Sequence, residues 1–325
     1  MRDVYTYLYD ARGNDKEITF TGVESIQLRK SHLLWVNVLR RDEDLIKQVT
    51  ARLGLENVPI KAIMNLNERP TLDNFDNYYR FSISSVELSD SNRLKRVPIC
   101  YLIGENFILT IHDGDINYFL EFRDREKGET QIGDLDAESF LATLLDLHLV
   151  TYFRALEKIE DAVDKLDVDI LRKDLRDEDF LKETVRLKSD VAKLRRWLLP
   201  HRDVFYALTR SDFQPVAESN STKDFQRLTQ HFENAVDAVE TSRDTVLSLF
   251  DLYATRSAHK MNGFIKRLTF VTLIVGTLGA VAGIWGMNFE VGYFKAAEQG
   301  FWMTIGGMGL FILISFVLGK IFQWI

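Results

Sequence analysis

Features typical of enzymes and of nucleic-acid-binding proteins are missing from this sequence of 325 residues. Its single cysteine, Cys100, can form neither an intrachain disulfide nor a CxxC site, which fits a reducing compartment. The formal net charge of −7 argues against nucleic acid as a partner, because such proteins are usually basic. No Gly-x-x-x-x-Gly-Lys-Ser/Thr phosphate loop and no nucleophile–base constellation can be found. We therefore expect neither an enzyme, nor an NTP-driven pump, nor a bound cofactor.

The sequence also lacks histidines at the spacing of a metal site. The six histidines are scattered and predict no preformed zinc site; they are His32, His112, His148, His201, His231 and His259. One acid-rich stretch is a candidate metal sensor, although such runs are more commonly solvated helix faces; it contains Asp161, Asp164, Asp167, Asp169, Asp174, Asp177, Glu178 and Asp179. The first residues carry no apolar secretory segment, so we expect membrane insertion to depend on the C-terminal part.

Two uncharged apolar runs dominate the C-terminal part of the sequence, at residues 268–287 and 299–319. Each is about as long as the roughly 20 residues with which a helix crosses a bilayer. Lys260, Lys266 and Arg267 precede the first run, and Lys320 follows the second. The positive-inside rule therefore predicts a multi-pass protein of the inner (plasma) membrane with cytoplasmic termini. The loop 288–298 is then external, and 320–325 form a short cytoplasmic tail.

The N-terminal part, residues 1–135, reads as a cytoplasmic α/β domain. Runs rich in β-branched and aromatic residues, bounded by Gly, Asn, Asp or Pro, predict strands at 33–39, 78–88, 97–103 and 107–112. Residues 43–53 and 115–125 have helical patterns. The alternation of strand and helix patterns indicates an α/β fold.

Residues 136–220 form an acidic helical region, and a stalk helix is expected at 221–267. A seven-residue stride supports the stalk: Phe225, Phe232, Val239, Val246 and Tyr253 are accompanied by Leu228, Ala235, Ser242 and Leu249. Such a stride is typical of a long helix packed along helical neighbours. It continues to the membrane, so we expect one helix to run into the first span.

One face of the first span carries small or polar side chains apart from one isoleucine. Steps of three and four residues select Asn262, Ile265, Thr269, Thr272, Gly276, Gly279 and Gly283. A small-residue stripe in a membrane helix indicates close helix packing, and Gly279-x-x-x-Gly283 is itself a packing motif. The polar members also fit a water-lined pore, which needs oxygens around an ion. The residues alone leave both interpretations open.

Distinctive residues stand at both ends of the first span: Asn262 and Lys-Arg-Leu-Thr at 266–269 at one end, and Gly-Ile-Trp-Gly-Met-Asn-Phe-Glu at 283–290 at the other. With these residues, the membrane part resembles the CorA superfamily of divalent-cation channels. The resemblance extends upstream through Val-Glu-Thr at 239–241, Arg-Asp at 243–244 and Asp-Leu-Tyr at 251–253. Looser matches at Arg69-Pro70 and at residues 106–110 carry it over nearly the whole chain.

The resemblance implies a homopentamer in which the first span of each subunit lines one central path. It also implies a selectivity filter at Gly286, Met287 and Asn288, where Asn288 amide oxygens hold a hydrated cation. At the inner end, Asn262 and Leu268 match a polar ring and a hydrophobic constriction. The resemblance therefore favours the pore, and the expected fold is a cytoplasmic α/β domain, a helical stalk and two membrane helices.

The sequence departs from the magnesium members of that superfamily. The loop lacks their Met-Pro-Glu, although Glu290 and Glu298 remain as acidic residues of the outer loop. Arg227 stands where those members place a regulatory aspartate. The leading hypothesis is passive transport of Mg²⁺ or Zn²⁺, with Co²⁺ and Ni²⁺ as further ions. The alternative is a membrane-anchored structural or regulatory protein that does not conduct.

Overall fold

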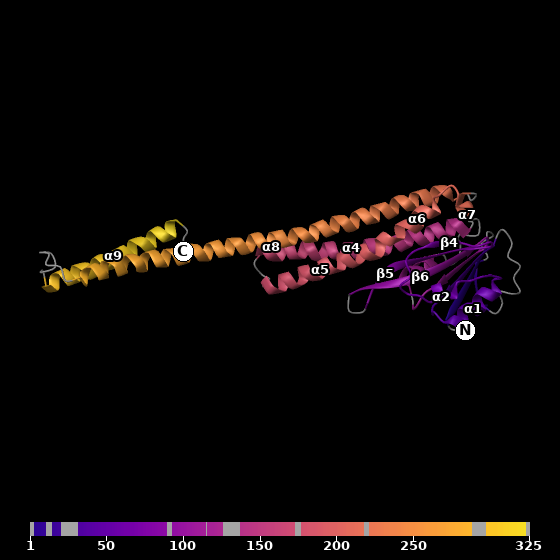
Figure 1. Ribbon diagram of the computed structural model, residues 1–325, viewed down its shortest axis with the longest axis horizontal. Coiled ribbons are helices and arrows are strands. Elements are labelled where there is room, and N and C mark those ends of the chain that lie inside the picture. Colours follow the sequence, from indigo (N-terminus) through magenta and orange to yellow (C-terminus); the bar gives the residue numbers. More distant parts are fainter. Residues whose placement is uncertain are drawn as a thin grey trace. The chain divides into compact units, whose positions relative to one another are not determined.

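The computed structural model describes residues 3–10, 15–20, 32–89, 93–114, 116–125, 137–172, 177–217, 221–287 and 297–322 (Figure 1). The chain divides into two compact units, Met1–Leu249 and Phe250–Ile325. Helix α8, Thr222–Trp285, contributes to both units.

A seven-stranded mixed sheet forms the centre of the first unit. Its order is β2-β1-β3-β7-β6-β5-β4, and among these neighbours β3 and β7 pair in parallel while the other pairs are antiparallel. The strands are β1 (Val4–Asp10), β2 (Lys16–Ile18), β3 (His32–Val38), β4 (Leu72–Asn74), β5 (Tyr79–Leu88), β6 (Leu94–Gly104) and β7 (Phe107–Ile111). The four strands predicted from β-branched and aromatic runs are confirmed as β3, β5, β6 and β7.

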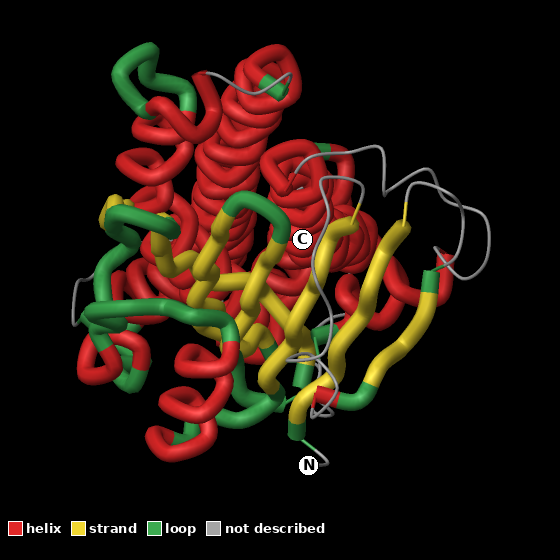
Figure 2. Tube along the Cα trace, turned by 90° about the vertical axis from the view of Figure 1, so that its right-hand side faces the viewer, coloured by secondary structure: helices red, strands yellow, loops and turns green. Residues whose placement is uncertain are grey.

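Both faces of the sheet are covered, which explains why its central strands are nearly continuous apolar runs (Figure 2). Helices α1 (Glu43–Arg52) and α2 (Ile60–Ile63) join one core, in which Ile46 and Ile63 pack with sheet residues such as Leu102. On the other side, Trp35 makes edge contacts with Phe119 of α3 (Asn117–Arg125) and Phe140 of α4 (Ala137–Arg172).

Long helices make up the rest of the first unit. After α4 come α5 (Asp177–Leu198), the 3-10 turn η3 (Leu199–His201), α6 (Arg202–Leu208), α7 (Gln214–Ala217) and α8. In Figures 1 and 2, α4, α5 and the first part of α8 run alongside one another. The stride of Phe225, Phe232, Val239 and Val246 is buried, which confirms a helix packed on helices. Ion pairs such as Arg195–Glu240 (2.5 Å) also connect α5 to α8.

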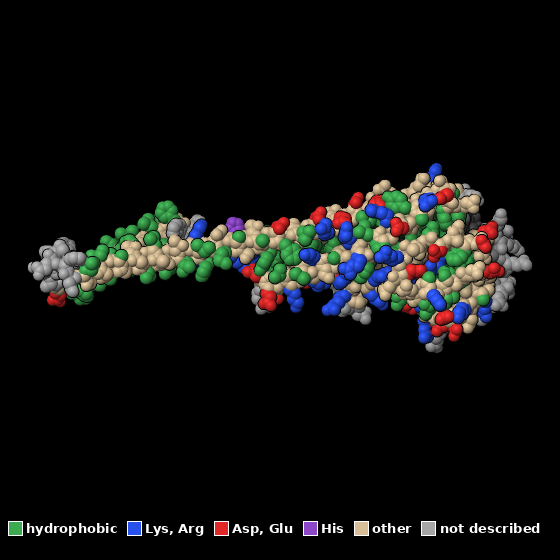
Figure 3. All heavy atoms as spheres, in the orientation of Figure 1, with side chains coloured by type: hydrophobic (Ala, Val, Ile, Leu, Met, Phe, Trp, Pro, Cys, Tyr) green, Lys and Arg blue, Asp and Glu red, His purple; other side chains and the backbone are tan. Residues whose placement is uncertain are grey.

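The second unit is a pair of helices, the end of α8 and α9 (Ala297–Ile321). Both helices are long and apolar enough to cross a membrane, with mean hydropathies of 2.0 and 2.1 over their most apolar windows. Apolar side chains gather on their surface, whereas the first unit shows many Lys, Arg, Asp and Glu side chains (Figure 3). The predicted fold class, an α/β domain followed by a long helix and two candidate membrane helices, is confirmed.

Candidate ion-conduction path

The membrane part of α8 has one face that packs against α9. Phe270 is buried there, and Ile274, Thr277, Val281 and Trp285 are partly buried. Their spacing of three and four residues places them along one side of the helix. The apolar run therefore uses one face for contacts within the chain.

The predicted pore-lining residues lie on another face and are all exposed: Asn262, Ile265, Leu268, Thr269, Thr272, Gly276, Gly279 and Gly283. At 3.6 residues per turn, the mean direction of the stripe from Thr269 to Gly283 is about 160° from that of the α9-facing residues. A Cβ atom added at Gly276, Gly279 or Gly283 would meet no other atom within 4 Å. The stripe is thus not a packing surface for α9, which the sequence could not reveal.

Threonine hydroxyls on the exposed face point their protons at the helix itself. Thr269 Oγ1 donates to the carbonyl oxygen of Ile265 (2.9 Å), and Thr272 Oγ1 donates to that of Leu268 (2.8 Å). A hydroxyl has one proton and two acceptor lone pairs. With the proton used inside the helix, each oxygen presents lone pairs outward, as an acceptor for water.

The stripe ends where α8 ends. There, the amide of Gly286 donates to the carbonyl oxygen of Ala282 (3.0 Å) and the amide of Met287 donates to that of Ile284 (3.2 Å), which closes α8. Asn288 and Glu290 lie outside the described residues. Glu298 is exposed in the first turn of α9. The predicted filter residues Gly286 and Met287 are exposed where α8 ends.

The acid-rich stretch spans the end of α4 and the start of α5, and its described members are exposed or partly exposed. Burial and the neighbouring Asp164 raise the pKa of Asp167. Within the described parts of the chain, no three His, Cys, Asp or Glu side chains are grouped to hold a metal. Arg227, which stands where the resemblance leads one to expect a regulatory aspartate, is exposed on α8 and lies 3.9 Å from Asp224. The stretch therefore has the character of a solvated helix surface.

Two histidines that are far apart in the sequence meet in the first unit. The rings of His148 and His201 are buried with centroids 5.4 Å apart. The backbone N–H of Ser84 donates to His201 Nε2 (2.8 Å), and Tyr152 donates to the Ser84 carbonyl oxygen (2.6 Å). Burial lowers the pKa of His148 to about 3, so this imidazole is neutral at physiological pH. His201 and Tyr152 thus connect η3 and α4 to strand β5.

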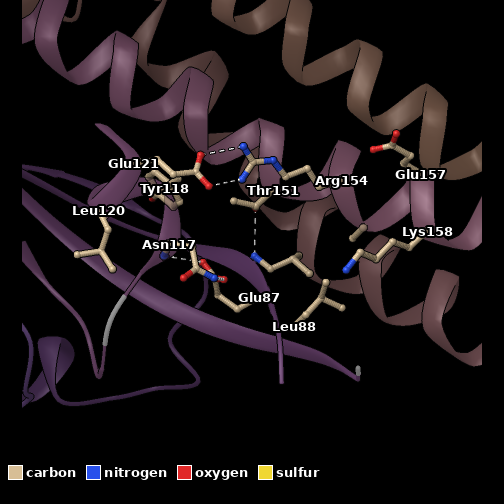
Figure 4. Close-up of a pocket in the computed structure, with 12 residues that line it drawn as sticks. Glu87, Leu88, Asn117, Tyr118, Leu120, Glu121, Thr151, Arg154, Glu157 and Lys158 are labelled. Carbon is tan, nitrogen blue, oxygen red and sulfur yellow. Dashed lines mark hydrogen bonds and ion pairs between the residues drawn. The ribbon is translucent and has the colours of Figure 1, made fainter. Parts of the chain in front are cut away.

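A cleft of about 580 Å³ lies between the end of β5, α3 and α4 (Figure 4). Arg154 donates two hydrogen bonds to Glu121 (2.9 and 2.8 Å), and Asn117 Nδ2 donates to Glu87 (2.6 Å). Burial raises the pKa of Glu87, against the lowering effect of the Asn117 hydrogen bonds. These pairs link α3 to β5 and α4. No sequence signal marked the cleft, because its residues come from separate parts of the chain.

The long sheet-bearing unit and the two apolar helices define the class of a membrane protein with a large soluble domain. The family described as CorA-like Mg²⁺ transporter protein matches residues 30–320. The cobalt/magnesium transport protein CorA of Thermotoga maritima is 28% identical over 316 residues, covering 95% of this chain and 89% of that protein. The protein of the same name from Methanocaldococcus jannaschii is 24% identical over 323 residues, covering 97% and 98%.

The fold agrees with these matches. The complete structure of the CorA magnesium transporter from Methanocaldococcus jannaschii has a TM-score of 0.79 at 20% identity, covering 98% of both chains. At that identity the likeness shows the fold. Because the family matches most of the sequence, this chain belongs to the CorA-like Mg²⁺ transporter family.

Proposed function

We propose that the protein is a passive channel for divalent cations, in which the exposed face of α8 lines a central path. The observation that carries this proposal is the position of the stripe from Asn262 to Gly283. It is small or polar apart from Ile265, it faces away from α9, and it has open space at its glycines. Lipid would leave the outward oxygens of Thr269 and Thr272 without polar surroundings, whereas a water-filled path provides them.

A single hairpin of two helices cannot enclose a path, so the proposal requires several copies of the chain. We propose a homopentamer with five α8 helices around the axis and α9 of each subunit outside them. The five-fold state comes from the resemblance to the CorA superfamily, and the related structure from Methanocaldococcus jannaschii is that of a CorA magnesium transporter. A monomer or dimer by native mass measurement in mild detergent would contradict this assembly.

At the outer mouth, the proposed filter is a ring of Asn288 amide oxygens next to Gly286 and Met287. Mg²⁺ gives up its water reluctantly and takes oxygen ligands, so a neutral oxygen ring that holds the hydrated ion suits it. Glu290 and Glu298 are the acidic residues of the outer loop and raise the local cation concentration. At the inner end, Asn262 supplies a polar ring and Leu268 a hydrophobic constriction.

The membrane potential is a sufficient driving force for such a channel. It contributes about 2.3 kcal/mol per charge per 100 mV, hence about 4.6 kcal/mol for a divalent ion. That corresponds to more than three decades of inward concentration bias, since about 1.4 kcal/mol is tenfold. No energy-converting site is then required, in keeping with the lack of a phosphate loop in the sequence.

The relatives named above transport cobalt and magnesium, and we propose Mg²⁺ and Co²⁺ as ions carried by this chain. We propose Zn²⁺ and Ni²⁺ as further ions because of the chemistry of the proposed filter. Inner-shell capture of zinc favours His or Cys ligands, and residues 262–319 contain neither. A neutral ring around a hydrated ion should therefore discriminate little among hexahydrated divalent ions.

The test is ion flux into proteoliposomes made with purified full-length protein, for each ion separately. Asn288→Ala should lower the flux of every divalent ion, because the ring loses its amide oxygens. Gln299→Ala is the matched control: it removes an exposed amide at the start of α9, outside the filter, and should leave flux near wild type. Undiminished transport by Asn288→Ala would overturn the proposed ring.

A further inference from the structure

An apolar groove runs between the two helices of the second unit. It has a volume of about 390 Å³ and is lined from α8 by Phe270, Leu273 and Ile274, and from α9 by Phe311, Ser315 and Phe322, among others. Apart from the Ser315 hydroxyl, the side chains named here are hydrocarbon. The groove therefore offers contacts to an apolar occupant and few to water or an ion.

On the α9 side, the length of the groove matches one leaflet of a bilayer. The lining extends from Phe311 to Phe322, the residue after α9, which at 1.5 Å per residue is about 16 Å, whereas on α8 it covers Phe270 to Ile274, about 6 Å. The hydrocarbon core of a bilayer is about 30 Å thick, so one leaflet contributes about 15 Å. The groove thus begins near the end of α9 and reaches about the bilayer midplane.

Lys266 and Arg267 stand at one end of this groove. They precede Phe270 by four and three residues, which places them on the same side of α8 as the groove. Side chains in a helix lean towards its N-terminus, here away from the hydrocarbon. Lys320 is exposed one residue after Gly319, which also lines the groove, but at 3.6 residues per turn Lys320 lies on the opposite face of α9. None of the three cations forms an ion pair with another residue that the structure describes.

We propose that the groove and these cations bind one anionic phospholipid per subunit from the leaflet on the basic side of the membrane. One acyl chain lies in the groove between Phe270 and Phe311, and the headgroup phosphate contacts Lys266 and Arg267, while Lys320 adds positive charge near the same end of α9. Basic clusters next to membrane helices attract anionic headgroups. A zwitterionic lipid carries its own cation beside the phosphate and gains less from the cluster.

The apolar length of the site distinguishes a lipid from free phosphate. Exposed charges alone bind a small anion weakly, because water and salt screen them. A lipid adds the burial of a chain against the groove, which inorganic phosphate cannot do. The proposal requires the two helices to lie in a bilayer and does not depend on conduction, so a protein without flux would still retain the lipid.

The test uses the full-length protein in mild detergent, with native mass spectrometry and melting temperature as readouts. Wild type should retain anionic phosphatidylglycerol in preference to phosphatidylcholine and should melt at a higher temperature when phosphatidylglycerol is added. The triple variant Lys266→Gln, Arg267→Gln, Lys320→Gln should retain the two lipids equally. Inorganic phosphate at millimolar concentration should not raise the melting temperature of wild type.

A second pair of variants tests the groove itself. Leu273→Trp adds a large ring at an exposed lip of the groove and should reduce retention of both lipids. Leu310→Trp is the control, since Leu310 is equally exposed on α9 but does not line the groove. Equal retention by the two Trp variants would overturn the proposal, as would no lipid preference in wild type, an intact preference in the triple variant, or stabilisation by phosphate alone.

Discussion

Replacing Gly279 by leucine tests whether the stripe on α8 is a conduction path or a packing surface. Gly279 is exposed on α8, faces away from α9, and has no atom within 4 Å of the position of an added Cβ. The change therefore causes no clash within the subunit. Leucine is also a better helix former than glycine, which is roughly 0.8–1 kcal/mol less favourable than alanine in a helix, so α8 should not be weakened.

In a pentamer the substitution places five isobutyl groups at one level of the proposed path. Hydrophobic constrictions stop ions by excluding water, and a hydrated divalent ion cannot easily shed its shell there. We expect flux of Mg²⁺ to fall at least tenfold, which corresponds to a barrier increase of about 1.4 kcal/mol. The assay is flux into proteoliposomes, with oligomeric state measured on the same preparation.

The matched control is Gly309→Leu on α9, because an added Cβ there also meets nothing within 4 Å. It should leave both flux and assembly near wild type. Gly279→Leu should keep the oligomer and lose flux. Loss of the oligomer in Gly279→Leu would show that the stripe packs subunits together, and normal flux with a normal oligomer would show that Gly279 does not line the path; either result refutes the reasoning.

Further predictions concern hydroxyl oxygens, core packing and pH. Thr272→Val should lower divalent flux several-fold, because it removes an outward-facing oxygen. Thr277→Val is the control: it loses the same kind of hydrogen bond (2.8 Å to the Leu273 carbonyl oxygen) on the α9-facing side and should leave flux unchanged. Equal fluxes in the two variants would contradict the role of Thr272. Phe232→Ala should lower the free energy of unfolding by about 3–5 kcal/mol, because Phe232 is fully buried and stacked on Phe205 with ring centroids 4.7 Å apart. Tyr206→Ala, at an exposed site, should lower it much less. Denaturant unfolding measures both variants. For His148, the folded-state pKa of about 3 lies below the ordinary value of 6.5, so its contribution to stability is complete above pH 6.5 and is lost as pH falls towards 3. We expect about 1.4 kcal/mol of lost stability per pH unit within that window, and a flatter pH profile in His148→Phe; an unchanged profile would contradict it.

Local patterns predicted many of the elements. The strands β3, β5, β6 and β7 were recognisable because buried strands need a run of apolar residues within a few positions. Strand β1, at Val4–Asp10, and the short β2 and β4 were not singled out. Helix α3 begins at Asn117, two residues after the expected start at residue 115, which lies outside the described residues.

Contacts between residues far apart in the sequence could not be predicted from its local patterns. His148 and His201 come from α4 and η3, and they meet because both helical segments pack on β5. The cleft at Glu87 and Arg154 depends on the same packing. Such contacts are set by the way elements fit together, and residue spacing along one element carries no record of them.

By itself, the sequence predicted the two candidate membrane spans, the heptad stride of α8 and the small-residue stripe, because each can be read along one continuous helix. It also identified the family through the residues that end the first span. Tertiary structure alone decided that α9 covers the face of Phe270 and leaves that of Gly279 open. The physical reason is that a helix presents all its faces in its sequence, but which face is buried depends on the partner that packs against it.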